Sequence, residues 1–351
     1  MSFTEEVAMS ELKTLQGVFG RKTFHCVKGL MVLATIGFLL IVFRGPSAGA
    51  DKLRMGYTSP SPTNGVLWVA DFARIFTKNG LDVEVLYMPG NIAIGSMMAG
   101  EIQFAHMTGA LMSPARLQGG DPLMLANFQD YLDDRLVVHS NIKSVEELKG
   151  KRIGVSRFGA ASHMRVLNVL PRYGMSDRDI IFLQIGDTPA RLTALLGNSI
   201  DATLATPPDH LQAVRMGMRI LLNLREMNIP YLGTGLVTTQ SFLARNRDVA
   251  RKVVKAYVEA IHLVKTNPEA SKRAFAKYRK TQDQKQLEEV YQTLLEMIKP
   301  KPYPSLDGLK TIFKDLSDRL PAAKTANPKD FIDVSLIEEL DRSGFIDGLY
   351  R

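Results

Sequence analysis

The chain has 351 residues, with 44 lysines and arginines, 36 aspartates and glutamates and a formal net charge of +8. The basic residues are spread along the sequence, so they exclude the concentrated basic surface that nucleic-acid binding requires. A chain of this length is long enough for two domains, since a domain typically takes about 100 to 200 residues.

The N-terminal residues have the pattern of an export signal. A basic stretch leads into the apolar run GLMVLATIGFLLIVF, residues 29–43, and small residues follow up to Ala50. This run is shorter than the ~20 apolar residues that span a bilayer, so it is typical of a secretory signal peptide. We expect residues 1–50 to be removed after Ala50 and the protein to be periplasmic. An uncleaved inner-membrane anchor, or a core helix of a cytosolic domain, is the alternative.

The single cysteine, Cys26, precedes the apolar run. It therefore does not have the position of a lipid-modified cysteine, which would follow that run. The exported part has no cysteine, which suits a bacterial periplasmic protein that is stabilised by its own core without disulfides.

After residue 51, short apolar runs alternate with helical patterns. Strands are predicted at 53–57, 81–88, 102–106 and 124–126, and helices from about Asn64 to Asn79 and at 92–99. The order of strand, loop and helix indicates a parallel sheet with right-handed crossovers.

A second series of the same kind begins near residue 144. Its predicted strands are 152–155, 180–185, 202–205 and 219–222, and its predicted helices are 162–173, 189–196 and 208–216. The chain then becomes almost wholly helical, with amphipathic patterns at 249–264, 287–298 and 306–316.

Six segments along the chain carry a family resemblance. They are LRMGY, GLDVEVLYMPGN, AGEIQFAHMTGA, SVEELKGKRIGVSRFG, LLGNSIDATLATPP and SLIEELDRSGFIDGLY, and they span most of residues 53–350. In this order they closely resemble the substrate-binding proteins of bacterial ABC importers for nitrate, sulfonates and taurine, whose domain is similar to that of thiamine-pyrimidine synthase.

The resemblance implies an α/β protein with the type II periplasmic binding protein fold. Two α/β lobes would be joined by two crossover strands and followed by a helical C-terminal tail. Lobe I would comprise residues 51–137 and 237–351, and lobe II residues 138–236. The first crossover is expected near 136–141 and the return near 235–238.

The resemblance also implies a function. The protein would be a monomer that captures a small anionic or zwitterionic organic molecule between its lobes and delivers it to an ABC permease in the inner membrane. We expect that it is not an enzyme and needs no cofactor. The histidines show no metal-ligand spacing with cysteine or with one another, so we also expect no metal. One alternative is an enzyme of the same fold, similar to the pyrimidine synthase or to the chorismate-processing enzymes, although the cysteine-rich iron-binding motif of the pyrimidine synthase is missing. Another alternative is a ligand-sensing partner of a membrane receptor.

Candidate ligand-binding residues of the first lobe follow strands or precede helices. Ligands of open α/β sheets bind beyond the carboxyl ends of the strands, where helix N-termini also attract anions. The candidates at such places are Tyr57, Thr58, Asn64, Asn91 and Thr108. Each could instead be a helix cap, because serine, threonine and asparagine are the preferred capping residues.

The second lobe offers a cluster of candidates in the loop after residues 152–155, namely Ser156, Arg157, Phe158 and Ser162. The guanidinium of Arg157 could pair with a carboxylate, sulfonate or phosphate, or it could be an ordinary exposed arginine. In the sulfonate-binding branch of the family, hydroxyl residues occupy the positions of Ala160 and Ala161, so the chain departs from that branch here.

Two threonines of the second lobe are secondary candidates, Thr188 before a predicted helix and Thr206 after a predicted strand. Gly233 and Gly235 lie on the return to the first lobe. They are candidate hinge residues that could absorb the backbone change of lobe closure, or they could serve a simple turn.

Overall fold

The computed structural model describes residues 52–158 and 161–351. The predicted export signal, residues 1–50, lies outside the described residues and stays a prediction. Within the described ranges, no helix combines the length and the apolar character that crossing a membrane requires. Residues 52–351 form one compact unit.

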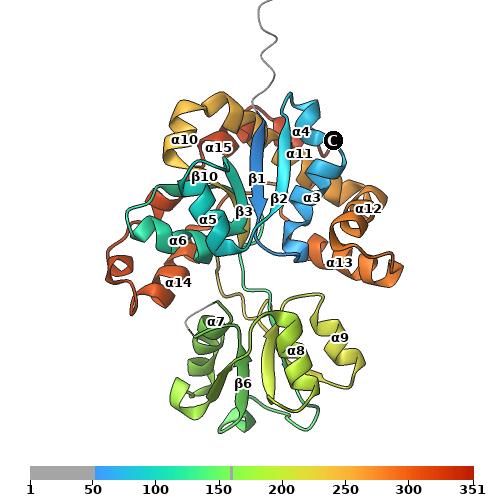
Figure 1. Ribbon diagram of the computed structural model, residues 1–351, viewed down its shortest axis with the longest axis vertical. Coiled ribbons are helices and arrows are strands. Elements are labelled where there is room, and N and C mark those ends of the chain that lie inside the picture. The colour runs from blue at the N-terminus through green and yellow to red at the C-terminus, as the bar shows by residue number, and fades with distance from the viewer. Residues whose placement is uncertain (1–51, 159–160) are drawn as a thin grey trace, which may run out of the picture. The chain divides into compact units, whose positions relative to one another are not determined.

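The sheet of the first lobe has the strand order β2-β1-β3-β10-β4 (Figure 1). Strand β1 pairs in parallel with β2 and β3, whereas β10 is antiparallel to β3 and β4. The strands are β1 (Leu53–Tyr57), β2 (Val83–Tyr87), β3 (Phe104–Thr108), β4 (Pro122–Asn127) and β10 (Thr234–Thr239). This lobe is therefore assembled from both ends of the described chain.

Helices cover both faces of this sheet because the side chains of its strands alternate between two apolar clusters. Leu123 and Leu125 of β4 contribute to one cluster, and Met124 to the other. The first cluster contains residues of α3 (Gly65–Phe72), α4 (Ile75–Lys78), α11 (Arg247–Thr266), α12 (Pro268–Arg279), α13 (Gln284–Met297) and α15 (Ser335–Arg342). The second contains residues of α5 (Gly90–Met98), α6 (Gly109–Leu117) and α14 (Leu306–Leu316).

Short elements complete this lobe. They are the helices α10 (Gln240–Arg245) and α16 (Phe345–Gly348) and the 3-10 turns η1 (Pro62–Asn64), η5 (Pro321–Lys324) and η6 (Pro328–Phe331).

The sheet of the second lobe has the order β7-β6-β8-β5-β9. Strand β6 is parallel to β7 and β8, and β5 is antiparallel to β8 and β9. The strands are β5 (Arg135–Val138), β6 (Arg152–Val155), β7 (Ile181–Gln184), β8 (Ala202–Ala205) and β9 (Arg219–Asn223). The helices are α7 (Ala161–Val169), α8 (Thr188–Leu196) and α9 (His210–Arg215), with the 3-10 turns η2 (Glu146–Leu148), η3 (Leu170–Tyr173) and η4 (Asp177–Asp179).

Two segments, residues 128–134 and 224–233, connect the sheets and run antiparallel to each other. Their backbones are hydrogen bonded, with Leu132 N donating to Ile229 O at 3.1 Å and Tyr231 N donating to Asp130 O at 2.7 Å. The two-lobed α/β fold with a helical tail agrees with the sequence prediction.

The predicted positions of the crossings need correction. Residues 136–141 were expected to cross between the lobes, but β5 already lies in the second sheet. Residues 235–238 were expected to form the return, but β10 lies in the first sheet. The predicted lobe boundaries, 137/138 and 236/237, consequently fall inside these two strands. The strands β5 and β10 are antiparallel to their neighbours. A hydrophobic pattern carries no information on strand direction, so the sequence did not show that these two strands belong to the sheets.

Most predicted elements occur, and the two largest differences have local causes. The helix expected from about Asn64 to Asn79 is interrupted, because Arg74 adopts a positive φ of 54° between α3 and α4. The helix expected at 162–173 ends at Val169 and continues as a 3-10 turn around Pro171. Proline ends an α-helix because it lacks the N–H and its ring clashes with the preceding turn.

Close packing accounts for the glycine at position 235, and neither candidate hinge glycine is among the glycines with positive φ. Gly235 lies within β10, where an added Cβ would come within 2.2 Å of the carbonyl oxygen of Ala126. Gly233 lies at the end of the second connecting segment, and a Cβ there would meet the side chain of Gln129 at 2.5 Å. The hinge role of these two residues stays a prediction.

We predict that Gly235→Ala lowers the free energy of unfolding by about 3 kcal/mol, because backbone atoms must move to admit the methyl group. Gly95→Ala is the matched control. An added Cβ at Gly95 meets nothing within 4 Å, and the residue lies in α5, so its replacement should raise the free energy by about 0.5 to 1 kcal/mol. Urea denaturation measures both values. A Gly235→Ala variant as stable as the unmodified protein would contradict the packing argument.

Candidate functional site

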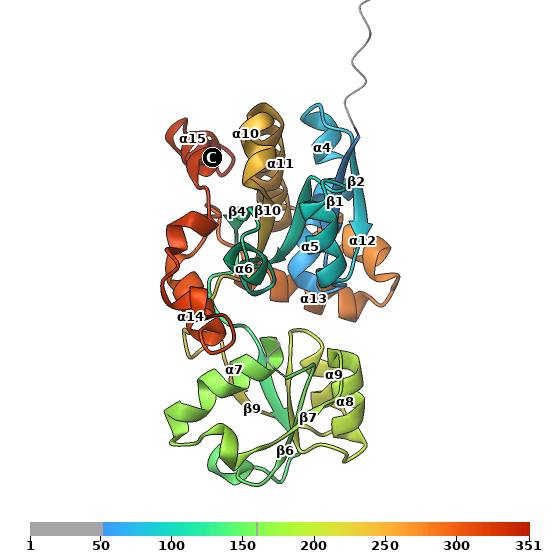
Figure 2. The same cartoon turned by 60° about the vertical axis from the view of Figure 1, so that its left-hand side comes forward.

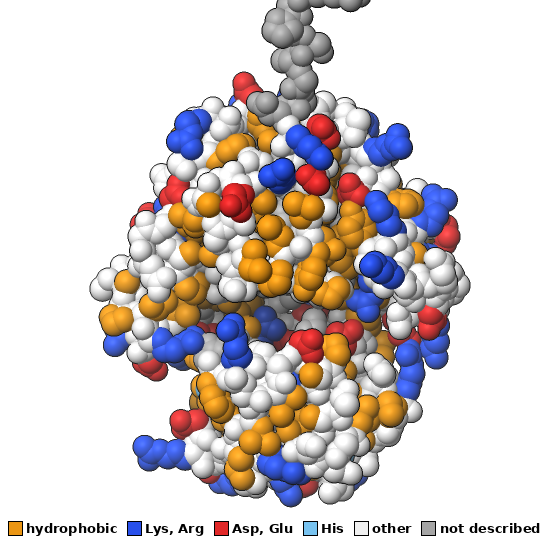
Figure 3. Space-filling model, in the orientation of Figure 1, with side chains coloured by type: hydrophobic (Ala, Val, Ile, Leu, Met, Phe, Trp, Pro, Cys, Tyr) orange, Lys and Arg blue, Asp and Glu red, His pale blue; other side chains and the backbone are white. Residues whose placement is uncertain are grey.

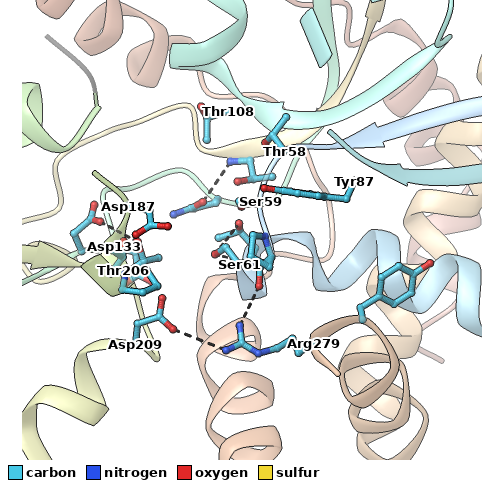
Figure 4. A pocket seen from close by; sticks show the side chains of 18 of the residues that line it. Thr58, Ser59, Ser61, Tyr87, Thr108, Asp133, Asp187, Thr206, Asp209 and Arg279 are labelled. Atoms are coloured by element: carbon cyan, nitrogen blue, oxygen red, sulfur yellow. Dashed lines mark hydrogen bonds and ion pairs between the residues drawn. The ribbon is translucent and has the colours of Figure 1, made fainter. Parts of the chain in front are cut away.

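A cavity of about 620 Å³ lies between the two lobes, and Figure 3 shows the cleft from outside. It is lined by the loop after β1, the end of β2, the end of α12, one connecting segment and the helix N-termini of the second lobe (Figure 4). The lining residues are Thr58, Ser59, Pro60, Ser61, Thr63, Tyr87, Thr108, Gln129, Asp133, Asp134, Arg165, Asp187, Thr188, Pro189, Thr206, Asp209, Thr234, Tyr278, Arg279 and Lys280. We call this the polar cavity.

Four of the eleven residues predicted from the sequence line the polar cavity, namely Thr58, Thr108, Thr188 and Thr206. Arg157 instead lines a second cavity, which also contains Thr108. The other six predicted residues line neither cavity: Tyr57, Asn64, Asn91, Ser156, Phe158 and Ser162.

Local contacts explain the positions of several of these residues. Ser162 Oγ accepts a hydrogen bond from Ser156 N at 2.8 Å and lies 2.9 Å from Ser156 Oγ, so the two serines satisfy each other at the start of α7. Asn91 is exposed near the start of α5, and Phe158 is 60% exposed. Thr108 is itself the N-cap of α6, because its Oγ1 accepts a hydrogen bond from Leu111 N.

A buried polar network holds the loop that follows β1. Asn64 Nδ2 donates to Ser59 O at 2.7 Å, and Asn64 Oδ1 lies 2.8 Å from His106 Nδ1. His106 Nε2 lies 2.7 Å from the hydroxyl of Tyr257. The amide oxygen of Asn64 can only accept, so Nδ1 of His106 donates and its Nε2 accepts from Tyr257. Asn64 thus acts on the polar cavity through Ser59, which lines it.

Burial controls the protonation of this network. His106 is fully buried, and desolvation lowers its pKa from 6.5 to about 3. The imidazole is therefore neutral at physiological pH, which leaves its Nε2 able to accept from Tyr257.

Aromatic rings form one wall of the polar cavity. Trp68 is completely buried and stacks on Tyr278 with centroids 5.4 Å apart and an angle of 5° between the rings. Tyr57 packs edge-on against both rings. Tyr87 contacts Tyr57 and is 57% exposed. Tyr57 therefore supports the wall, while Tyr87 and Tyr278 present their rings to the cavity.

Sequence reasoning missed the carboxylates of the cavity. Asp133 and Asp134 are each 4% exposed, and both have arginine partners. Asp133 Oδ1 lies 3.0 Å from Arg135 Nη1, and Asp134 Oδ2 lies 2.5 Å from Arg165 Nη1. Both aspartates precede a strand, whereas the residues predicted from the sequence follow strands or precede helices.

One arginine links the two lobes across the cavity. Arg279, at the end of α12 in the first lobe, donates from Nη1 to Pro60 O at 3.0 Å, and its Nη2 lies 3.9 Å from Asp209 Oδ1 in the second lobe. Figure 4 shows the contact of Arg279 with Asp209. Burial raises the pKa of Asp209 despite the nearby arginine.

A second buried arginine organises the turn that carries Thr188. Arg191 is 5% exposed, and its guanidinium donates to Thr188 Oγ1, Thr203 Oγ1 and Gly186 O. It therefore fixes the N-terminus of α8 against the end of β8.

We predict that His106 makes the protein less stable in mild acid. Its folded pKa, about 3, lies below the unfolded value of 6.5, so the unfolded state binds the proton more readily. The stability that the neutral histidine contributes is fully present above pH 6.5 and is lost as the pH falls toward 3. By pH 5 this loss amounts to about 2 kcal/mol. In His106→Gln the amide can make the same two hydrogen bonds without titrating, so the variant should lose stability less steeply. Urea denaturation across this pH range gives both slopes.

His210 provides the control for this measurement. Burial lowers the pKa of His210 to about 4, so His210→Gln should remove a separate share of the acid sensitivity. Equal slopes for His106→Gln and the unmodified protein would exclude His106 as a source.

Comparisons with known proteins agree with this architecture. The sequence pattern of the family described as NMT1/THI5 like matches residues 66–271. A Brucella abortus protein that is provisionally named a binding protein is 24% identical over 252 residues, 69% of this chain and 76% of the relative. A Brachyspira hyodysenteriae protein, provisionally named an ABC transporter periplasmic binding protein, is 26% identical over 270 residues, 71% and 76% of the two chains.

A solved structure shows the same fold. The periplasmic aliphatic sulphonate binding protein SsuA from Escherichia coli superposes with a TM-score of 0.68 at 20% identity, covering 81% of this chain and 92% of SsuA. With the family pattern matching more than half of its residues, the chain belongs to the NMT1/THI5-like family and has the periplasmic binding protein fold.

Proposed function

We propose that this protein is an extracytoplasmic solute-binding protein of an ABC import system. It captures a small organic molecule between its lobes and delivers it to a membrane permease. The observation that carries this proposal is the polar cavity, whose volume is within the range of ligand sites and whose lining comes from both lobes. The Brachyspira relative, named as a periplasmic binding protein of an ABC transporter, supports it.

The lining of the polar cavity suits a ligand with both hydrogen-bond donors and acceptors. Carboxylates of four aspartates and the cationic side chains of Arg165, Arg279 and Lys280 lie around the same space. The ligand therefore meets both signs of charge, which favours a zwitterion. An anion would approach these three residues rather than Arg157, which lines the other cavity.

Lobe closure follows from the way the ligand is held. A ligand that touches both lobes binds the closed arrangement better than the open one, so it shifts the population toward closure. The connecting segments are the only covalent links between the two described sheets, which leaves them as the axis of this motion. Capture of this kind makes and breaks no bond in the ligand.

We predict that a small solute raises the melting temperature of the purified protein. A thermal-shift panel would contain nitrate, alkanesulfonates, taurine, amino acids, aliphatic and aromatic carboxylates and thiamine pyrimidines. A ligand at about 100 times its dissociation constant stabilises the native state by about 2.7 kcal/mol. Absence of any shift in the folded protein would contradict capture of the solute classes in the panel.

Variants locate the binding of any ligand found. Thr58→Val and Thr206→Val each remove one hydroxyl from opposite lobes of the polar cavity and keep the shape of the side chain. Each should weaken binding by about fivefold to tenfold, since a hydrogen bond contributes about 1 kcal/mol. The exposed Thr325, outside both cavities, is the control, and Thr325→Val should bind as the unmodified protein does. Affinity unchanged in both cavity variants would place the ligand elsewhere.

A further inference from the structure

A second cavity of about 510 Å³ lies between α6 and α14 of the first lobe and α7 of the second. Figure 2 shows α6 and α14 on the side of the first lobe that faces α7. Its wall is mostly apolar, with Leu111 from α6, Met164 from α7 and Ile312 and Leu316 from α14. We call it the apolar cavity.

The two cavities meet at Thr108, which lines both. Thr108 ends β3 and caps α6, so it lies where the carboxyl end of a central strand faces the cleft. The cavities also share a partition. Arg165, which lines the polar cavity, lies over the ring of Tyr231, which lines the apolar cavity, with 5.0 Å from its guanidinium carbon to the ring centroid.

The two spaces differ in chemistry. The polar cavity presents aspartates, arginines and hydroxyl groups, and the apolar cavity presents aliphatic side chains with polar groups only at Thr108, Tyr231, Arg157, Asp315 and Arg319. A molecule with one polar end and one apolar end fits this division, because each part would be desolvated against groups of its own kind.

We infer that the apolar cavity is a subsite for an apolar substituent of the captured solute, whose polar group lies in the polar cavity and whose chain passes Thr108. The inference rests on the proposed function and specifies the ligand as an elongated amphipathic molecule. Because Thr108 lines both cavities, we assign both to one ligand.

A hydrogen bond between the lobes joins two of the helices around this subsite. Asn168 of α7 donates to Asp315 of α14 at 2.6 Å, which joins the two walls. Burial raises the pKa of Asp315 to about 6, while Arg165, Lys314 and Arg319 nearby act in the opposite direction. The subsite is therefore complete only when the lobes are together, as expected for a place that a ligand occupies upon closure.

The test is a comparison of chain lengths at a constant head group. Calorimetry would give dissociation constants for two series, from 2-aminobutanoate to 2-aminooctanoate and from ethanesulfonate to octanesulfonate. If the chain enters the apolar cavity, the affinity in the series that binds should rise about fourfold per added methylene. Affinity that stays level or falls with chain length, while the short members bind, would overturn the inference and leave solute capture intact. Absence of binding in both series would count against the proposed function and the inference alike.

Variants that fill the apolar cavity show where the chain lies. Ala161→Trp, at the exposed start of α7, and Ala110→Phe, at the start of α6, each introduce a large ring into its wall. In each variant the affinity should no longer rise with chain length, so that the long-chain and short-chain ligands bind about equally well. The control is Ala322→Trp, at an exposed alanine outside both cavities, which should keep the fourfold gain. Circular dichroism verifies that each variant is folded. An undiminished gain in both folded cavity variants would overturn the inference.

Discussion

The backbone pairing of the two connecting segments is the constraint on which the site depends. Hydrogen bonds from Tyr231 to Asp130 and from Gly233 to Gln129 hold the segments side by side. The first segment then delivers Asp133 and Asp134 to the polar cavity, and the second delivers Tyr231 to the apolar one. A change in this pairing would therefore displace both cavities together, because their walls begin within a few residues of it.

Electrostatic pairing keeps the polar cavity in one arrangement before any ligand binds. Taking a charge out of water costs several kcal/mol unless a partner compensates for it. Asp133 and Asp134 have such partners in Arg135 and Arg165. Arg191 is compensated by hydroxyl and carbonyl oxygens at the start of α8 and in β8. Removal of one partner would leave a buried charge behind, so Asp133, Asp134 and Arg165 stabilise the cavity as well as line it. A ligand consequently meets oriented groups and loses little free energy in ordering them.

Sequence reasoning identified the local features of this protein and missed those that depend on distant contacts. The strands β1, β6 and β8 were predicted to the residue. Thr58 and Thr108 line the polar cavity, as residues that follow or end strands of the first sheet. Asp133 was missed because its place at the cavity depends on the pairing of the two connecting segments, which lie about a hundred residues apart in the sequence. Arg157 was a candidate for pairing with an anion or an ordinary exposed arginine, and it lines the apolar cavity. No spacing along the chain encodes that position.

With two cavities that meet at one threonine, the protein would select the head group of a ligand in one cavity and its apolar chain in the other. In the polar cavity a mismatched ligand leaves a buried polar group unpaired, which costs about 1 to 3 kcal/mol for each group. In the apolar cavity a missing methylene costs only about 0.8 kcal/mol. The head group should therefore be selected strictly and the chain length loosely, so that one protein would accept a set of homologous solutes. A cavity of this fold that lacked the apolar extension between α6, α7 and α14 would select the head group alone.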